Sequence, residues 1–155
     1  LRHNDSRPVG GLRAIVVSST VLGAAVLGAG NANADGPVQL RSRLGDACVD
    51  AAGGNWLNPP VINPCNGSDA QRWNVNADGR LESVAFPGQC LNGGDTARVG
   101  IAACWGSRRW NIQPDGRITA VLSGCLTVLG GTNPGTWLGT RFCNGSPEQG
   151  WDSVP

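Results

Sequence analysis

Carboxylates and cysteines are the groups in this chain whose chemistry could carry a function. Asp46 and Asp50 lie four residues apart, which in an extended segment is about 13 Å, too wide for the ~5 to 10 Å of the two glycosidase geometries. After residue 34 the chain has no His, Lys or Tyr, so the usual general bases and nucleophiles are missing. We therefore expect no catalytic residue and no enzyme activity, although an acid pair assembled from distant segments stays open.

The cysteines all follow residue 34, and their even number in an exported chain indicates disulfides. A zinc site is disfavoured, because the chain has no CxxC pair and its single histidine is His3. We expect neither a metal nor a cofactor. The six cysteines are Cys48, Cys65, Cys90, Cys104, Cys125 and Cys143.

The N-terminal 34 residues have the organisation of a secretory signal peptide. Three Arg within the first 13 residues precede an apolar run, 14–28, and small residues at 32–34 offer a cleavage site after Ala34. The alternative, a single membrane span, is disfavoured because the run is shorter than the ~20 residues that a bilayer core needs. The sequence predicts a secreted protein, residues 35–155, with no membrane span in its mature form.

The charge balance argues against a nucleic-acid binder. Twelve Arg and eleven Asp or Glu give the whole chain a net charge of +1, and no basic stripe is present. The pair Arg108 and Arg109 favours a solvated strand surface over a phosphate clamp. We expect no nucleic-acid partner, and the sequence does not determine the oligomeric state.

Residues 35–155 contain an internal repeat. The segment 73–81, Trp-Asn-Val-Asn-Ala-Asp-Gly-Arg-Leu, recurs at 110–118 as Trp-Asn-Ile-Gln-Pro-Asp-Gly-Arg-Ile. Each of three units contains a first Cys, a Gly-rich loop, a second Cys and then a Trp, so the simplest disulfide pairing is within each unit: Cys48 with Cys65, Cys90 with Cys104, and Cys125 with Cys143. The units, called repeats one to three, are 35–77, 78–114 and 115–155.

Local signals predict an all-β fold. Residues 38–44, 81–86 and 118–122 are short apolar-rich runs, Asp-Gly pairs are strong hairpin-turn signals, and helical periodicity is absent after residue 34. A β-propeller typically needs four to eight blades. Three units of ~40 residues that close a sheet without free edges instead predict a β-trefoil.

At this level the chain resembles the ricin-type (QxW) lectins, in particular secreted single-domain members from actinobacteria such as mycobacteria. Gln71-Arg72-Trp73 and Gln149-Gly150-Trp151 are QxW motifs, and Arg108-Arg109-Trp110 is a degenerate copy. The resemblance covers 35–155 and implies that the three Trp pack in the core, while the Gln orders local geometry. It also implies carbohydrate as the ligand.

The resemblance further implies where sugar binds: an Asp two residues after the first Cys, an aromatic platform two residues before the second Cys, and an Asn before the QxW Gln. Repeat one keeps the Asp as Asp50, but has Asn63 at the platform position and Ala70 at the Asn position. We place the best site here, with Asp50, Asn63, Gln71 and Trp56 as a substitute platform. Asp50 is expected at the surface, so that Asp50→Ala would barely change the melting temperature; the alternative is a loop-capping acid.

Weaker candidates come from the other repeats and from substitute aromatics, each of which could instead pack beneath a loop. Repeat two offers Asn92, Ala102 and Ser107, and repeat three offers Thr127, Arg141 and Glu148; the aromatics are Trp105, Trp137 and Phe142. Because so many family features are replaced, the competing hypothesis is a trefoil with decayed sugar sites that contacts a protein partner through its loops.

Overall fold

The structure is a computed structural model that describes residues 36–93, 98–120, 122 and 124–155. The described residues belong to one compact unit. The signal peptide predicted for 1–34 lies outside them.

The described residues form strands joined by turns and by three single-turn 3₁₀ helices. Within these residues no helix is long and apolar enough to cross a membrane. The strands are β1 (Gln39–Ser42), β2 (Cys48–Asp50), β3 (Val61–Asn63), β4 (Trp73–Val75), β5 (Leu81–Ser83), β6 (Gln89–Asn92), β7 (Gly100–Ala103), β8 (Trp110–Ile112), β9 (Ile118–Ala120), β10 (Gly124–Val128), β11 (Thr136–Arg141) and β12 (Trp151–Val154). The 3₁₀ helices are η3 (Asp69–Gln71), η4 (Cys104–Gly106) and η5 (Pro147–Gln149).

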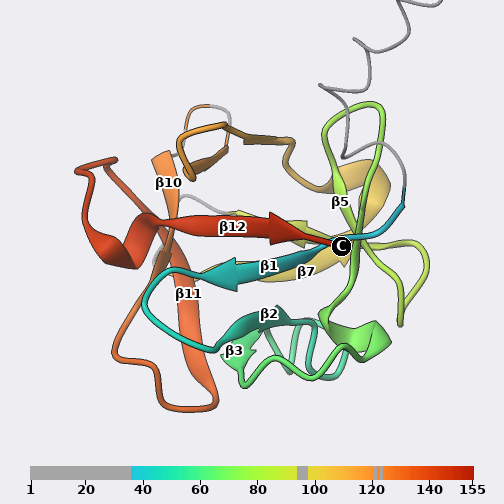
Figure 1. The fold of residues 1–155 in the computed structure, drawn as a ribbon. Coiled ribbons are helices and arrows are strands. Elements are labelled where there is room, and N and C mark those ends of the chain that lie inside the picture. Colours follow the sequence, from blue (N-terminus) through green and yellow to red (C-terminus); the bar gives the residue numbers. More distant parts are fainter. Residues whose placement is uncertain (1–35, 94–97, 121, 123) are drawn as a thin grey trace, which may run out of the picture. The chain divides into compact units, whose positions relative to one another are not determined.

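Strand pairing follows the three repeats. Within each repeat the second and third strands form an antiparallel pair, namely β2 with β3, β6 with β7 and β10 with β11. The last strand of each repeat pairs with the first strand of the next, which gives β4 with β5, β8 with β9 and, closing the circle, β12 with β1. Figure 1 shows β12 beside β1, although they come from opposite ends of the domain. The predicted threefold β-trefoil is confirmed.

The Asp-Gly turns join consecutive repeats, as predicted. In the first, the N–H of Asn76 donates to the carbonyl of Arg80 at 2.9 Å, and Gly79 has a φ of 92°. A left-handed residue is needed to reverse the chain here, and Gly adopts it without steric cost. The strands are shorter than the apolar runs in the sequence suggested, because the chain leaves the sheet before each run ends. One such turn follows β5, where the N–H of Phe86 donates to Oγ of Ser83 at 3.1 Å.

The core is built around the three repeat Trp residues, all buried. Each indole Nε1 donates to the carbonyl of the residue after its own repeat's first cysteine: Trp73 to Val49 at 3.1 Å, Trp110 to Leu91 at 2.9 Å and Trp151 to Leu126 at 3.0 Å. A buried indole N–H needs such a partner. The Trp residues therefore have the structural role that the resemblance implied.

All three disulfides pair within a repeat, as predicted. Their partners are 17, 14 and 18 residues apart in the sequence, for Cys48–Cys65, Cys90–Cys104 and Cys125–Cys143 respectively. Loops of this length each contribute about 3 kcal/mol of stability through the entropy of the unfolded chain. Each bridge joins the second strand of its repeat to the segment that follows the third strand.

Candidate functional site

Gln71 fastens the second cysteine of repeat one beside Asp50. Its side chain is buried; Oε1 accepts a hydrogen bond from the N–H of Asn66 at 2.8 Å, and Nε2 donates to the carbonyl of Pro64 at 3.0 Å. These two main-chain groups flank Cys65. Nε2 also donates to Oδ2 of Asp50 at 3.2 Å. One side chain thus links η3, the disulfide and the end of β2.

Asp50 is only 8% exposed, so the expectation of a surface acid is wrong. Besides Gln71, its carboxylate accepts hydrogen bonds from the N–H of Ala52 at 2.8 Å and from Nδ2 of Asn63 at 3.2 Å. Ala52 has a φ of 54°, a left-handed conformation that the Asp50 bond helps to hold. Asp50 therefore has the loop-capping role given above as the alternative. A carboxylate has about four acceptor positions, so these three donors leave about one for a ligand hydroxyl.

Asn63 connects repeat one to repeat three. Its Nδ2 bonds to Asp50, while its Oδ1 accepts a hydrogen bond from the N–H of Gly135 at 3.1 Å. The residue at the platform position is thus a polar bridge between two repeats and provides no ring face. Asp50, Asn63 and Gln71 are called the repeat-one cluster below.

Trp56 lies at the tip of the loop between β2 and β3 and is 75% exposed, so it is not packed beneath that loop. The loop is braced from inside, because Oδ1 of Asn55 accepts hydrogen bonds from the N–H groups of Leu57 at 3.0 Å and Asn58 at 3.2 Å. At its base, a Cβ on Gly54 would lie 2.4 Å from the Phe86 ring, so only glycine permits this contact. The structure presents Trp56 on a supported loop; it forms no bond with the repeat-one cluster among the hydrogen bonds of the described residues.

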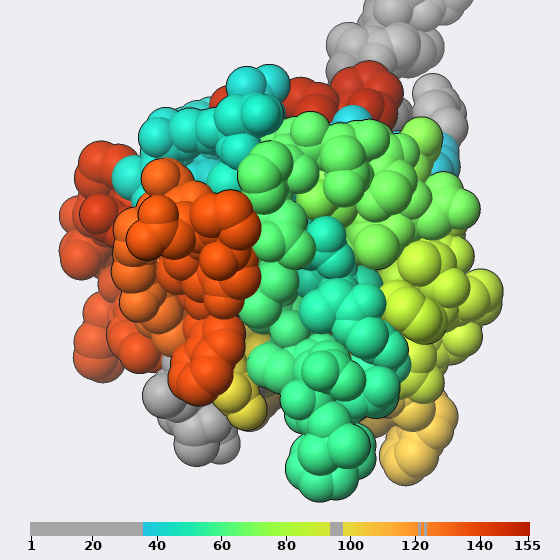
Figure 2. Space-filling model, turned by 90° about the horizontal axis from the view of Figure 1, so that it is seen from below, coloured from blue at the N-terminus to red at the C-terminus, as the bar shows by residue number. Residues whose placement is uncertain are grey.

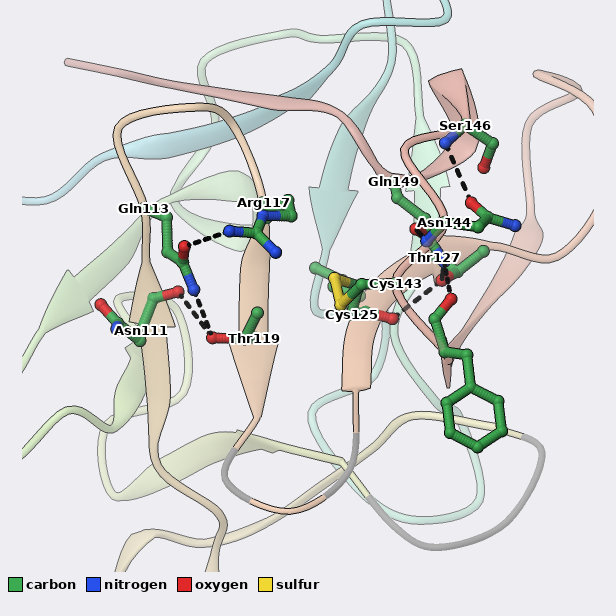
Figure 3. The surroundings of a disulfide bond; sticks show 12 residues. Asn111, Gln113, Arg117, Thr119, Cys125, Thr127, Cys143, Asn144, Ser146 and Gln149 are labelled. Atoms are coloured by element: carbon green, nitrogen blue, oxygen red, sulfur yellow. Dashed lines mark hydrogen bonds between the residues drawn. A yellow bond between two sulfur atoms is a disulfide. The ribbon is translucent and has the colours of Figure 1, made fainter.

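Repeat three reproduces the glutamine geometry with a neutral acceptor (Figure 3). Oε1 of Gln149 accepts a hydrogen bond from the N–H of Asn144 at 2.8 Å, and Nε2 donates to the carbonyl of Phe142 at 2.8 Å. Nε2 also donates at 3.2 Å to the hydroxyl of Thr127, which stands where Asp50 stands in repeat one. That hydroxyl donates in turn to the carbonyl of Cys125 at 2.8 Å. Phe142 is exposed and Arg141 lies on the adjoining strand end.

Repeat two has no glutamine at this position. Arg108 occupies the Gln position, and its main-chain N–H donates to Oδ1 of Asn92 at 3.0 Å. The hydroxyl of Ser107 is turned inward and donates to the carbonyl of Cys104 at 3.0 Å. Trp105 follows this cysteine and is exposed, so it is not packed against the disulfide.

Trp137 is a candidate that the structure brings to repeat one. It lies on β11, is 51% exposed, and pairs across the strands with Val61 of β3. The guanidinium of Arg98 lies 4.2 Å from the centroid of its ring. Sequence reasoning missed Arg98, although a signal was present: Pro59, Arg98 and Trp137 each stand six residues before the second cysteine of their repeat.

A hollow of about 370 Å³ lies elsewhere, at the junction of repeats one and three. Its two arginines are paired with carboxylates, Arg43 with Asp152 at 2.9 Å and Arg117 with Asp115 at 2.8 Å. It contains no exposed aromatic ring on which a sugar could stack. Within the described part of the chain, no group of three or more His, Cys, Asp or Glu could hold a metal ion.

Comparison with known proteins decides the family. Residues 36–151 match the ricin-type β-trefoil lectin domain. The chain belongs to this family. It is 56% identical over 155 residues to an uncharacterised protein of Mycobacterium tuberculosis, and the match covers 97% of this chain and 99% of that protein. An uncharacterised protein of Mycobacterium bovis is equally similar.

Several solved structures share the fold. The C-half of an earthworm R-type lectin in complex with GalNAc superposes with a TM-score of 0.67 at 13% identity, over 77% of this chain and 98% of that one. The Macrolepiota procera ricin B-like lectin in complex with lactose gives a TM-score of 0.65 at 19% identity, over 76% and 94%. A designed threefold-symmetric protein, ThreeFoil, gives 0.62 at 19% identity, over 78% and 99%.

Proposed function

We propose that this chain is a secreted, non-catalytic lectin that binds carbohydrate through repeat one. The observation that carries the proposal is the Asp50–Gln71 pair. Of the three residues two positions after a first cysteine, Asp50 is the single acid, and Gln71 orients its carboxylate. A carboxylate accepts hydroxyl hydrogen bonds more strongly than the neutral Asn92 or Thr127, because charge-assisted hydrogen bonds are the stronger kind.

Family membership supports carbohydrate as the ligand class, and the solved lectins with bound GalNAc and lactose have the same fold. The non-catalytic role is supported by the residues present. All six cysteines are in disulfides, and Asp46, the acid nearest to Asp50 in the sequence, pairs with Arg41 at 3.6 Å.

A glycan array with the purified protein tests the function. Specific signals that a soluble sugar competes away would support a lectin, and titration of Asp50→Asn and Thr127→Val against the best sugar would locate the site. Asp50→Asn keeps the shape and removes the charge, and it replaces one of the two acceptor oxygens by an NH2 donor; it is expected to lower affinity about tenfold or more. Thr127→Val is the matched control in repeat three and should leave affinity unchanged.

One observation favours the competing function, binding of a protein partner. Several large apolar side chains are exposed on loops and strand ends, and exposed apolar surface commonly marks interaction sites. They are Trp56, Leu57, Trp105, Leu122, Trp137 and Phe142. A blank array together with a protein captured by the wild type, but not by Trp56→Ala, would replace the lectin proposal with this one.

Secretion is proposed from the predicted signal peptide together with three disulfides, which persist in oxidising compartments. Material exported by the producing cell is expected to begin at Asp35 and to contain no free thiol. Intact mass with and without alkylation measures both. Retention of residues 1–34 in the exported protein would contradict the proposal.

A further inference from the structure

Three neighbouring strands align an acid, an aliphatic side chain and an aromatic ring in one row. Val61 on β3 is the cross-strand partner of Asp50 on β2 and also of Trp137 on β11. Residues directly opposite in antiparallel strands project to the same face, with Cβ atoms about 5 Å apart. Asp50 and Trp137 therefore face the same way, about 10 Å apart by two such steps. Between them lies the half-buried Val61.

This row joins repeat one to repeat three on the surface. The N–H of Gly135 donates both to Oδ1 of Asn63 at 3.1 Å and to the carbonyl of Ile62 at 2.8 Å, so the start of β11 is held against β3. In Figure 2 the orange surface of repeat three lies directly against the green surface of repeat one. An exposed ring from the neighbouring repeat, that of Trp137, thus lies on the strand next to β3.

Arg98 of repeat two adds a charge beside Trp137. Its guanidinium lies 4.2 Å from the centroid of the Trp137 ring, and the N–H of the next residue, Val99, donates to the carbonyl of Leu138 at 2.7 Å. No carboxylate lies within 4.0 Å of Arg98 among the residues that the structure describes. A guanidinium that covers a ring with its face keeps its in-plane N–H donors available. Half of the Trp137 side-chain surface remains exposed beside it.

We infer that Asp50, Val61, Trp137 and Arg98 form one composite site, contributed by all three repeats, for a glycan that carries a uronic acid. The inference rests on the proposed function and specifies its ligand. Asp50 accepts a hydrogen bond from one ring hydroxyl, the apolar side of the sugar packs on Val61 and Trp137, and Arg98 binds the sugar carboxylate. A planar carboxylate matches the two parallel N–H groups of a guanidinium.

The charges of Asp50 and Arg98 select this ligand. A neutral hexose would meet Asp50 and Trp137 but would bring no anion to Arg98. A uronic acid carries hydroxyls and a carboxylate on the same ring, so it can engage both residues. An anion without a sugar ring would meet Arg98 but gain nothing from Asp50, because like charges repel.

Matched sugar pairs test the inference in titrations with the whole secreted protein. The methyl glycosides of galacturonic, glucuronic and mannuronic acid are compared with those of galactose, glucose and mannose, because each pair differs only at C6. At least one uronate is expected to bind about tenfold or more tightly than its neutral partner, and this preference should weaken as salt is added. Arg98→Gln should remove the preference while neutral binding persists, and Trp137→Ala should weaken both members of the pair.

Arg117→Gln is the charge-matched control, since Arg117 lies at the turn between β8 and β9 and pairs with Asp115. It should preserve the preference. An unchanged preference in a folded Arg98→Gln variant, or uronates that bind no better than neutral sugars, would overturn the inference and leave the lectin function standing. A glycan array without any sugar signal would instead overturn the lectin function itself. Equal binding of a sulfated hexose would overturn the assignment of the anion as a carboxylate.

Discussion

Repeats one and three place the same glutamine on two different acceptors. Gln71 and Gln149 both bond to the carbonyl before and the N–H after their second cysteine, with distances between 2.8 and 3.0 Å. The remaining amide hydrogen meets the carboxylate of Asp50 in repeat one and the hydroxyl of Thr127 in repeat three. The two repeats therefore share the hydrogen bonds of the glutamine to the second cysteine's neighbours, which we call the frame, but differ in the charge of the acceptor that the glutamine meets. One residue, two positions after the first cysteine, distinguishes a charged cluster from a neutral one.

The largest expected effect concerns what the two repeats share. Trp73→Ala and Trp151→Ala each remove a buried indole and its hydrogen bond, and each should cost about 3 to 5 kcal/mol of unfolding free energy. Urea melts measure the loss, with the exposed Trp56→Ala as the control. If either core variant melted like the wild type, the shared frame would not depend on its Trp.

The glutamines come next. Gln71→Ala and Gln149→Ala each remove the two part-buried hydrogen bonds to the carbonyl and N–H that flank the second cysteine, at a cost of about 1 to 3 kcal/mol. Gln71→Ala is expected to cost more, because it also removes a donor to a carboxylate, and charge-assisted bonds are stronger. Chemical denaturation of both variants measures the difference. A larger loss for Gln149→Ala would reverse this ranking of the two repeats.

Exchange of the acceptors separates frame from chemistry. Asp50→Thr gives repeat one the residue of repeat three, and should lower sugar affinity about tenfold or more at a stability cost of about 1 kcal/mol. A surface position would imply a negligible loss of stability. Here we expect a measurable loss, because Ala52 and Asn63 lose a hydrogen-bond acceptor. Calorimetric titration and thermal melts of the same sample measure both. Full affinity in Asp50→Thr would show that the charge is irrelevant to binding.

The smallest effect lies away from both clusters and depends on pH. The pKa of Glu82 is lowered because its carboxylate accepts hydrogen bonds from the side chain of Asn76 at 3.0 Å and the N–H of Gly88 at 2.9 Å. A lowered folded-state pKa gives stability that is present above the unfolded pKa and lost as pH falls through the folded pKa. Glu82→Gln should therefore cost under about 1 kcal/mol at neutral pH and nothing in acid. Urea midpoints at neutral and strongly acidic pH measure the difference, and an equal loss at both would contradict it.

Two further carboxylates should add to the same loss of stability in acid. The pKa values of Asp78 and Asp115 are lowered, chiefly by hydrogen bonds from the main-chain N–H groups of Arg80 and Arg117. Both acids belong to the Asp-Gly turns that join the repeats, so the sign of their effect is the same as for Glu82. The comparison of Glu82→Gln with the wild type measures the contribution of Glu82 alone to the loss of stability in acid, because Asp78 and Asp115 are the same in both proteins.

The repeat made the fold predictable from the sequence. Cysteine pairing, the turn at Asp78-Gly79 and the burial of Trp73 all follow from elements that recur in register, and each is confirmed. Contacts that cross repeats were not predictable. Gly135 reaches Asn63, 72 residues away, and Arg98 reaches Trp137, because strand pairing and not local sequence brings them together. The burial of Asp50 was missed for the same reason, since two of its three donors lie more than ten residues distant.

The pairing of β1 with β12 also sets the order in which the molecule can be completed. β1 is the first strand of the domain to be made. Arg41 can pair with Cys48 of β2 at once, but Gln39 and Arg41 meet their partners on the other side, Val154 and Asp152, only when β12 emerges. Until then one edge of the growing sheet is without its neighbour, so the nascent domain cannot close. Long-range pairings of this kind also slow folding in general, because the intervening chain must be ordered before the last contact forms. Closure of the domain is therefore a late event that depends on β12.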